Sequence, residues 1–129
     1  MSGTICPDCE NVVRAIPSLK YDENTHEIDE GFLSGWRVSV SRIAIYPLDA
    51  QWQVLRNDLE KDGIRVVILA EFNIGDLKAV AEGIKHSRGQ VEVEASPTAT
   101  NKGHAEIVPG VTAALSKKML HLCDLRHAS

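Results

Sequence analysis

Alternation between apolar and polar residues is clearest in the second half of the chain. The run Ile64–Phe72 is apolar almost throughout and rich in β-branched residues, which is typical of a strand buried on both faces. Residues 90–96 alternate strictly, so that two valines and an alanine point inward and two glutamates point outward. A turn signal at Asn101–Gly103, followed by a further apolar-polar alternation at His104–Val108, predicts that this strand returns as a β-hairpin.

Three stretches repeat apolar residues at helical spacing. The first, Asp49–Asp62, opens on an N-cap candidate, Asp49, and is followed by Gly63, a residue typical of helix ends. The second, Gly75–Ser87, carries polar i,i+4 neighbours beside its apolar stripe, and the third occupies residues 111–122. The three apolar stripes consist of Trp52, Leu55 and Leu59; Leu77, Val80, Ala81 and Ile84; and Val111, Leu115, Met119 and Leu122.

These elements predict the fold class. Arg37–Ile45 alternates but changes face midway, which indicates either a strand with an irregularity or two short elements, closed by Pro47. Strand 64–72, helix 75–87 and strand 90–96 together read as a β-α-β unit. We therefore expect an α+β domain, in which a small mixed β-sheet, made of this unit plus the hairpin, is packed by two or three helices.

The first 31 residues carry the weakest pattern. A short helix is expected at Asp8–Ala15, ended by Pro17, because proline disfavours helix in the residue before it. Tyr21–Gly31 contains five acidic residues, which favours a solvated, mobile loop. We predict a loosely structured segment at residues 1–31 and one compact α+β domain at residues 32–129.

Composition narrows the classes of partner. The chain has 129 residues, of which 43% are hydrophobic and 25% charged, and this places it among globular domains. Its net charge is -4 and its second half, with eight basic and seven acidic residues, is nearly neutral, so nucleic acid binding is disfavoured. No apolar run is long enough to span a membrane. Three cysteines cannot all pair within the chain, which favours a soluble protein of the reducing cytoplasm.

Two cysteines at the start of the chain form half of a zinc motif. Cys6 and Cys9 are separated by two residues, the spacing at which two cysteines in structural zinc sites bind the same ion. Cys123 and His127 lie four residues apart and would share a face if the last helix continued that far. These four residues would make a structural zinc site that ties the two ends of the chain together. In the alternative, the cysteines bind no metal and Cys123 packs against the core.

A second set of candidate residues lies on the predicted hairpin. His104-Ala105-Glu106 matches the H-x-E of zinc deaminases, but no downstream C-x-x-C follows it, so that activity is excluded. The outward positions of the two strands are Glu92, Glu94, His104 and Glu106. Such a face can bind a divalent ion or raise a carboxyl pKa for acid–base catalysis. In the alternative, it is the solvated face of a half-exposed sheet.

Three functions follow from these patterns. No nucleophile elbow, phosphate-binding loop or dinucleotide fingerprint is present, which favours a binding or accessory module that recognises a protein or small ligand. The edge of the hairpin strand would allow a homodimer. The alternatives are a hydrolase-type enzyme that uses the His/Glu face and a domain stabilised by structural zinc. Whether the chain is an enzyme stays open at this point.

Overall fold

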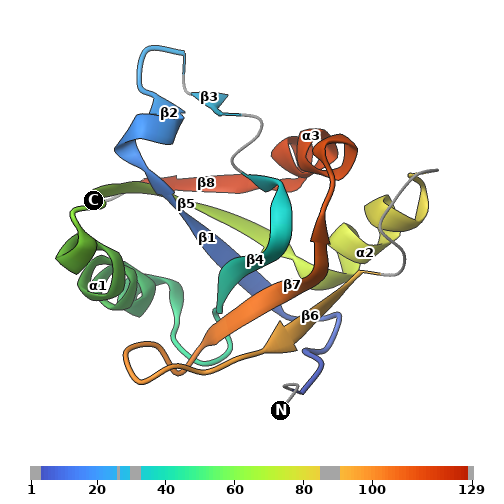
Figure 1. The fold of residues 1–129 in the computed structure, drawn as a ribbon, viewed down its shortest axis with the longest axis horizontal. Helices are drawn as coiled ribbons and strands as arrows, with labels where there is room; N and C mark the ends of the chain where they lie inside the picture. The colour runs from blue at the N-terminus through green and yellow to red at the C-terminus, as the bar shows by residue number, and fades with distance from the viewer. Residues whose placement is uncertain (1–3, 26, 30–32, 85–90, 128–129) are drawn as a thin grey trace.

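A six-stranded sheet forms the centre of the protein, with the strand order β6-β7-β4-β1-β5-β8 (Figure 1). The computed structural model describes residues 4–25, 27–29, 33–84 and 91–127. The six strands are β1 (Asn11–Pro17), β4 (Gly35–Arg42), β5 (Val66–Asn73), β6 (Glu92–Ala95), β7 (His104–Val111) and β8 (Asp124–His127). A separate pair is formed by β2 (Tyr21–Asp22) and β3 (Glu27–Ile28). The helices are α1 (Leu48–Leu59), α2 (Ile74–Glu82) and α3 (Ala113–Leu122), with 3-10 turns at Ser18–Lys20 and Glu60–Asp62.

Helices cover both faces of the sheet. Figure 1 shows α1 on one side, and α2 and α3 on the other. The α1 face buries a small apolar cluster around Leu55 and Leu69. The α2/α3 face buries the larger core, in which Leu77, Leu115 and Met119 pack against strand residues. One compact α+β domain with three helices results, and the expected fold class is confirmed.

The predicted β-α-β unit has an unexpected geometry. Strand β5 precedes α2 in the chain, and β6 follows it. The two strands point in the same direction, because four successive antiparallel pairings connect them across the sheet. They are not neighbours, because β1, β4 and β7 lie between them. Among the described strands, every pair of neighbours is antiparallel. The parallel pairing expected of a mixed sheet is therefore not found between these neighbours.

The beginning of the chain corrects the sequence-based expectation. The helix predicted at Asp8–Ala15 is absent, and β1 occupies a central position between β4 and β5. Its register against β5 runs from Asn11 to Pro17, and three of its side chains, Val12, Val13 and Ile16, are fully buried. The described part of the segment predicted to be loose therefore contains a central, buried strand. The predicted domain start at residue 32 lies outside the described residues, but the sheet itself begins at β1.

Smaller differences concern where elements begin and end. Helix α1 starts at Leu48 with Pro47 at its N-cap, so Asp49 lies in the first turn. Strand β4 ends at Arg42, so the predicted strand 37–45 is shorter than expected and residues 43–45 form a turn. The register shift that β4 contains lies around Arg37, whose φ of 49° is left-handed, and not midway along the predicted strand. Helix α2 ends at Glu82 and residues 83–84 are not helical, so the second helix ends earlier than expected. Ser87 and the predicted strand start at residue 90 lie outside the described residues. Helix α3 ends at Leu122, and the chain continues as β8.

Candidate functional site

The structure places the four predicted catalytic residues on one face of the β6–β7 hairpin. Glu94 lies directly opposite Glu106. Glu92 and His104 each precede one of these glutamates by two residues, and they lie on opposite sides of the Glu94–Glu106 pair. Side chains directly opposite each other in an antiparallel pair are close, and like charges there are destabilising. The hairpin therefore needs a cation beside these carboxylates.

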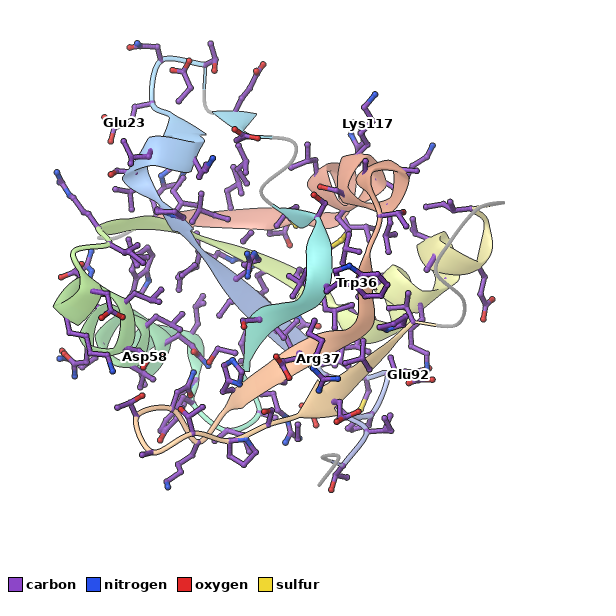
Figure 2. All side chains as sticks on the ribbon, in the orientation of Figure 1. Glu23, Trp36, Arg37, Asp58, Glu92 and Lys117 are labelled. Carbon is purple, nitrogen blue, oxygen red and sulfur yellow. The ribbon has the colours of Figure 1, made fainter. Side chains whose placement is uncertain are left out.

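Arg37 supplies that cation. Its Nη2 lies 3.0 Å from Glu106 Oε1 and 3.6 Å from Glu94 Oε1, and its Nε donates to Glu106 Oε1 at 3.1 Å. The hydrogen bond to Glu106 raises the pKa of Arg37. In Figure 2, Arg37 projects over strand β7, in keeping with these contacts. The two glutamates are thus engaged in ion pairs that hold β4, β6 and β7 together.

Glu92 is engaged as well, at the place where β6 approaches α2 (Figure 2). Lys78 Nζ lies 3.1 Å from Glu92 Oε2 and 2.9 Å from Asp8 Oδ1. Within the described part of the chain, no group of three His, Cys, Asp or Glu side chains could hold a metal ion. The three glutamates therefore act as ion-pair partners in this structure. His104, the fourth member of the predicted set, contacts the uncharged groups of Ser96 and Ser39.

The four predicted zinc ligands do not come together. Cys6 is bonded through its backbone N–H to Val93 in β6, whereas His127 lies in β8 at the opposite edge of the sheet. Burial raises the pKa of Cys6, and burial with the nearby Asp124 carboxylate raises the pKa of Cys123 to about 12. Zinc binds thiolates, which these environments disfavour. Cys9 is exposed, so the set of Cys6, Cys9, Cys123 and His127 is not assembled as a zinc site.

A cavity lies between α1 and the sheet, on the same face as His104. Its volume is about 250 Å³. Most of the lining is aliphatic, including Val13, Ala15, Val40, Leu55, Leu59 and Ile64. The polar lining residues are Arg14, Ser39, Asp58, Asn101 and His104. An apolar cavity into which a few polar groups converge is the usual form of a small-molecule site.

Arg14 carries the positive charge of this cavity. Strands β1 and β4 are paired at Val12–Arg42 and Val13–Ser41, and beyond these pairs they diverge (Figure 1). In the opening, Arg14 Nη1 donates a hydrogen bond of 2.7 Å to the carbonyl oxygen of Ser39. Burial lowers the pKa of Arg14 to about 10, which leaves the guanidinium protonated at neutral pH. The cavity therefore combines an aliphatic wall with a cation.

His104 and Ser39 form a hydrogen-bonded pair at the cavity. His104 Nδ1 lies 2.8 Å from the carbonyl oxygen of Ser96, and Nε2 lies 3.2 Å from Ser39 Oγ. Because a carbonyl oxygen can only accept, the Nδ1 atom must carry a proton. In the neutral ring, Nε2 is then an acceptor, and the Ser39 hydroxyl donates to it. Ser39 is exposed, so this hydroxyl is accessible from the solvent.

A buried polar network fixes the walls of the cavity. Ser41 Oγ donates to Gln51 Oε1 at 2.6 Å, and Asn101 Nδ2 donates to Ser41 Oγ at 3.1 Å. Gln51 Nε2 also donates to the carbonyl oxygens of Arg42 and Tyr46, at 2.9 and 2.8 Å. The network joins α1, β4 and the loop between β6 and β7, three of the segments that line the cavity.

Sequence reasoning predicted His104 but missed Arg14 and Ser39. The signal for Arg14 is a single charge inside the run Val12-Val13-Arg14-Ala15-Ile16, where its neighbours are strongly apolar. Alternation already put Ser39 and Ser41 on one side of their strand. The pattern gives no information on the pairing of β4 with β7, and it is this pairing that places Ser39 close to His104.

No family model, curated protein or solved structure gives a significant match to this chain. None of the helices within the described ranges is both long and apolar enough to cross a membrane. Function therefore has to be inferred from the cavity and its residues.

Proposed function

We propose that this chain is a small-ligand-binding module whose cavity takes an aliphatic carboxylate. The observation that carries the proposal is the presence of Arg14, whose Nη1 donates to the carbonyl oxygen of Ser39, among the residues that line a mainly aliphatic cavity of about 250 Å³. Pockets for drug-sized ligands have volumes of roughly 300–1,000 Å³, so this cavity suits a smaller molecule. The aliphatic wall would bury the chain of such a ligand, and Arg14 would bind its head group.

A carboxylate fits Arg14 better than a neutral head group does. The guanidinium is a planar group with several N–H donors, and it binds carboxylates through charge-assisted hydrogen bonds. Asp58, the acidic residue of the lining, accepts a hydrogen bond from Thr100 Oγ1 and lies 3.8 Å from Lys61 Nζ. These contacts offset its negative charge, so Asp58 opposes an anionic ligand less than an isolated carboxylate would.

The test is titration calorimetry with straight-chain carboxylates from butanoate upward and with the matching primary alcohols. Each methylene that enters the cavity contributes about 0.8 kcal/mol, or roughly a fourfold gain in affinity, until the cavity is full. Carboxylates are expected to bind more tightly than alcohols of the same length, since a hydrogen bond to a charged group contributes about 1.5–3 kcal/mol.

Arg14→Met removes the charge and keeps a long side chain. The variant is expected to bind carboxylates at least about tenfold more weakly, while its affinity for the alcohols stays close to that of the parent chain. Arg56→Met is the matched control, because Arg56 lies on α1 outside the cavity lining and contacts Glu60 and Trp52. Equal carboxylate affinity in Arg14→Met and the parent chain contradicts the proposal, as does an affinity independent of chain length.

A further inference from the structure

The pair formed by Ser39 and His104 has the geometry of a nucleophile with its base. The imidazole is oriented by the Ser96 carbonyl oxygen at 2.8 Å from Nδ1, which leaves Nε2 directed at Ser39 Oγ, 3.2 Å away. A nucleophile, a base within hydrogen-bond reach and a third group that orients the base are the parts of an acyl-transfer site. Ser39 and His104 also line the cavity that holds Arg14.

We propose that the chain hydrolyses carboxylic esters of short aliphatic acids, with Ser39 as the nucleophile and His104 as the general base. The inference rests on the proposed function, because the acyl chain of the ester would occupy the same aliphatic cavity. An ester of a bound acid presents its carbonyl carbon where the carboxylate carbon of that acid lies, beside Arg14 and Ser39. Binding of the acid and cleavage of its ester then use the same cavity.

The reaction balances with water as the second reactant. Ser39 Oγ attacks the ester carbonyl carbon while His104 Nε2 takes the hydroxyl proton, and the carbonyl electrons move to oxygen. When the tetrahedral intermediate collapses, the bond to the alcohol oxygen breaks, and that oxygen takes the proton from Nε2. Water then attacks the acyl-Ser39 ester with Nε2 as its base. The acid leaves, and Ser39 Oγ recovers its proton from Nε2.

Arg14 has a role in this step that follows from its position. Negative charge develops on the carbonyl oxygen in the tetrahedral intermediate, and a fixed cation in an apolar cavity stabilises such charge. The guanidinium is held beside the nucleophile, since its Nη1 donates to the carbonyl oxygen of Ser39 itself. The glutamates of the hairpin are not needed, because Ser96 orients the imidazole and Arg37 and Lys78 engage the carboxylates.

The experiment measures hydrolysis of p-nitrophenyl butanoate and hexanoate, together with the mass of the peptide that contains Ser39 after rapid acid quench. The parent chain is expected to turn over both esters and to carry the acyl group on Ser39. Ser39→Ala and His104→Gln are each expected to lose about a hundredfold in rate or more, the usual contribution of a positioned base. His121→Ala is the control, since this exposed histidine on α3 reports unspecific hydrolysis by free imidazole.

Binding of butanoate and hexanoate to the same variants separates the two proposals. Loss of hydrolysis with retained acid binding in Ser39→Ala supports the inference and shows that the variant is folded. If the parent chain binds the acids but Ser39→Ala hydrolyses the esters as fast, or the acyl group is found elsewhere, the inference is overturned and the binding function stands. If the parent chain neither binds the acids nor hydrolyses the esters, both proposals are overturned.

Discussion

The thiols of the three cysteines differ in accessibility, and burial raises the pKa of two of them. Cys6 is 2% exposed, Cys123 is partly buried and Cys9 is exposed. Burial is the main cause that raises the pKa of Cys123 to about 12, and it raises the pKa of Cys6 as well. The thiolate is the reactive form of cysteine. Reactivity toward alkylating agents should therefore be concentrated at Cys9.

Brief treatment of the folded chain with iodoacetamide at pH 8 is expected to modify one thiol per chain, at Cys9. At pH 9, Cys123 with a pKa near 12 is only about 0.1% thiolate, so a higher pH recruits it poorly. Peptide mass mapping measures the sites, and Cys9→Ser provides a chain that should stay unmodified. Modification of Cys123 at a rate comparable with Cys9 contradicts this expectation.

At the same scale, the sequence predicted candidate residues better than it predicted their partners. Alternation placed Glu92, Glu94, His104 and Glu106 on one face, and the structure places them so. The partners of Glu106 and His104 lie far away in the chain, because Arg37 and Ser39 come from β4, which precedes β7 by more than 60 residues. A local pattern shows which way a side chain points but not which strand lies beside it.

At the scale of the elements, buried polar contacts connect α1 with the sheet. Gln51, Ser41 and Asn101 are buried, and their hydrogen bonds connect α1 with β4 and the β6–β7 loop. Gln51 alone makes three of these contacts, through Oε1 to Ser41 and through Nε2 to Arg42 and Tyr46. Removing its amide leaves buried groups without partners, which costs more than the net gain of an average hydrogen bond.

Gln51→Ala is expected to lower the free energy of unfolding by about 2–4 kcal/mol, from buried groups that lose their partners and from the space left behind. Gln53→Ala is the matched control, because Gln53 lies on the exposed side of α1 and donates to Asn57 at 3.2 Å. Its change should stay within about 0.5 kcal/mol. Urea denaturation of both variants measures the difference, and equal losses contradict the role of the network.

The elements that sequence predicted well are those whose pattern is local. Helices α1 and α2 and strand β5 each carry a long apolar run or stripe, and all three exist, although α2 ends at Glu82 and not at the expected Ser87. Strand β1 was missed because the seven residues Asn11–Pro17 are too few to separate a helix from a strand by periodicity. Long-range pairing with β4 and β5 decides its structure, and this information is absent from the segment itself.

At the scale of the whole molecule, the first and last described segments of the chain lie at opposite edges of the sheet. Residues 4–6 lie along β6, where Cys6 N–H donates to the carbonyl oxygen of Val93 and Ala95 N–H donates to that of Thr4. Strand β8 pairs with β5 through four residue pairs. Strand β7, whose edge was expected to be exposed, lies between β6 and β4. Self-association through β7 is therefore not favoured by this topology.

Strand β8 covers a long strand that would otherwise be an open edge. Its four pairs run from Ile68–His127 to Glu71–Asp124, and Arg126 Nε lies 3.0 Å from Glu71 Oε1. Without β8, the N–H and C=O groups on that edge of β5 would face solvent, and β5 is a long and largely apolar strand. A long, apolar, unpaired edge is a template for pairing between chains.

Removal of residues 124–129 is therefore expected to increase self-association relative to the full chain. The free energy of unfolding should also fall by about 2–4 kcal/mol, at roughly 1 kcal/mol for each hydrogen bond lost. Arg126→Gln is the control, because it removes the ion pair to Glu71 but keeps the backbone pairing of β8. Sedimentation velocity over a range of concentrations distinguishes the chains. If the shortened chain sediments like the full chain at every concentration, β8 does not protect β5. If Arg126→Gln self-associates as the shortened chain does, the side chain of Arg126 provides the protection.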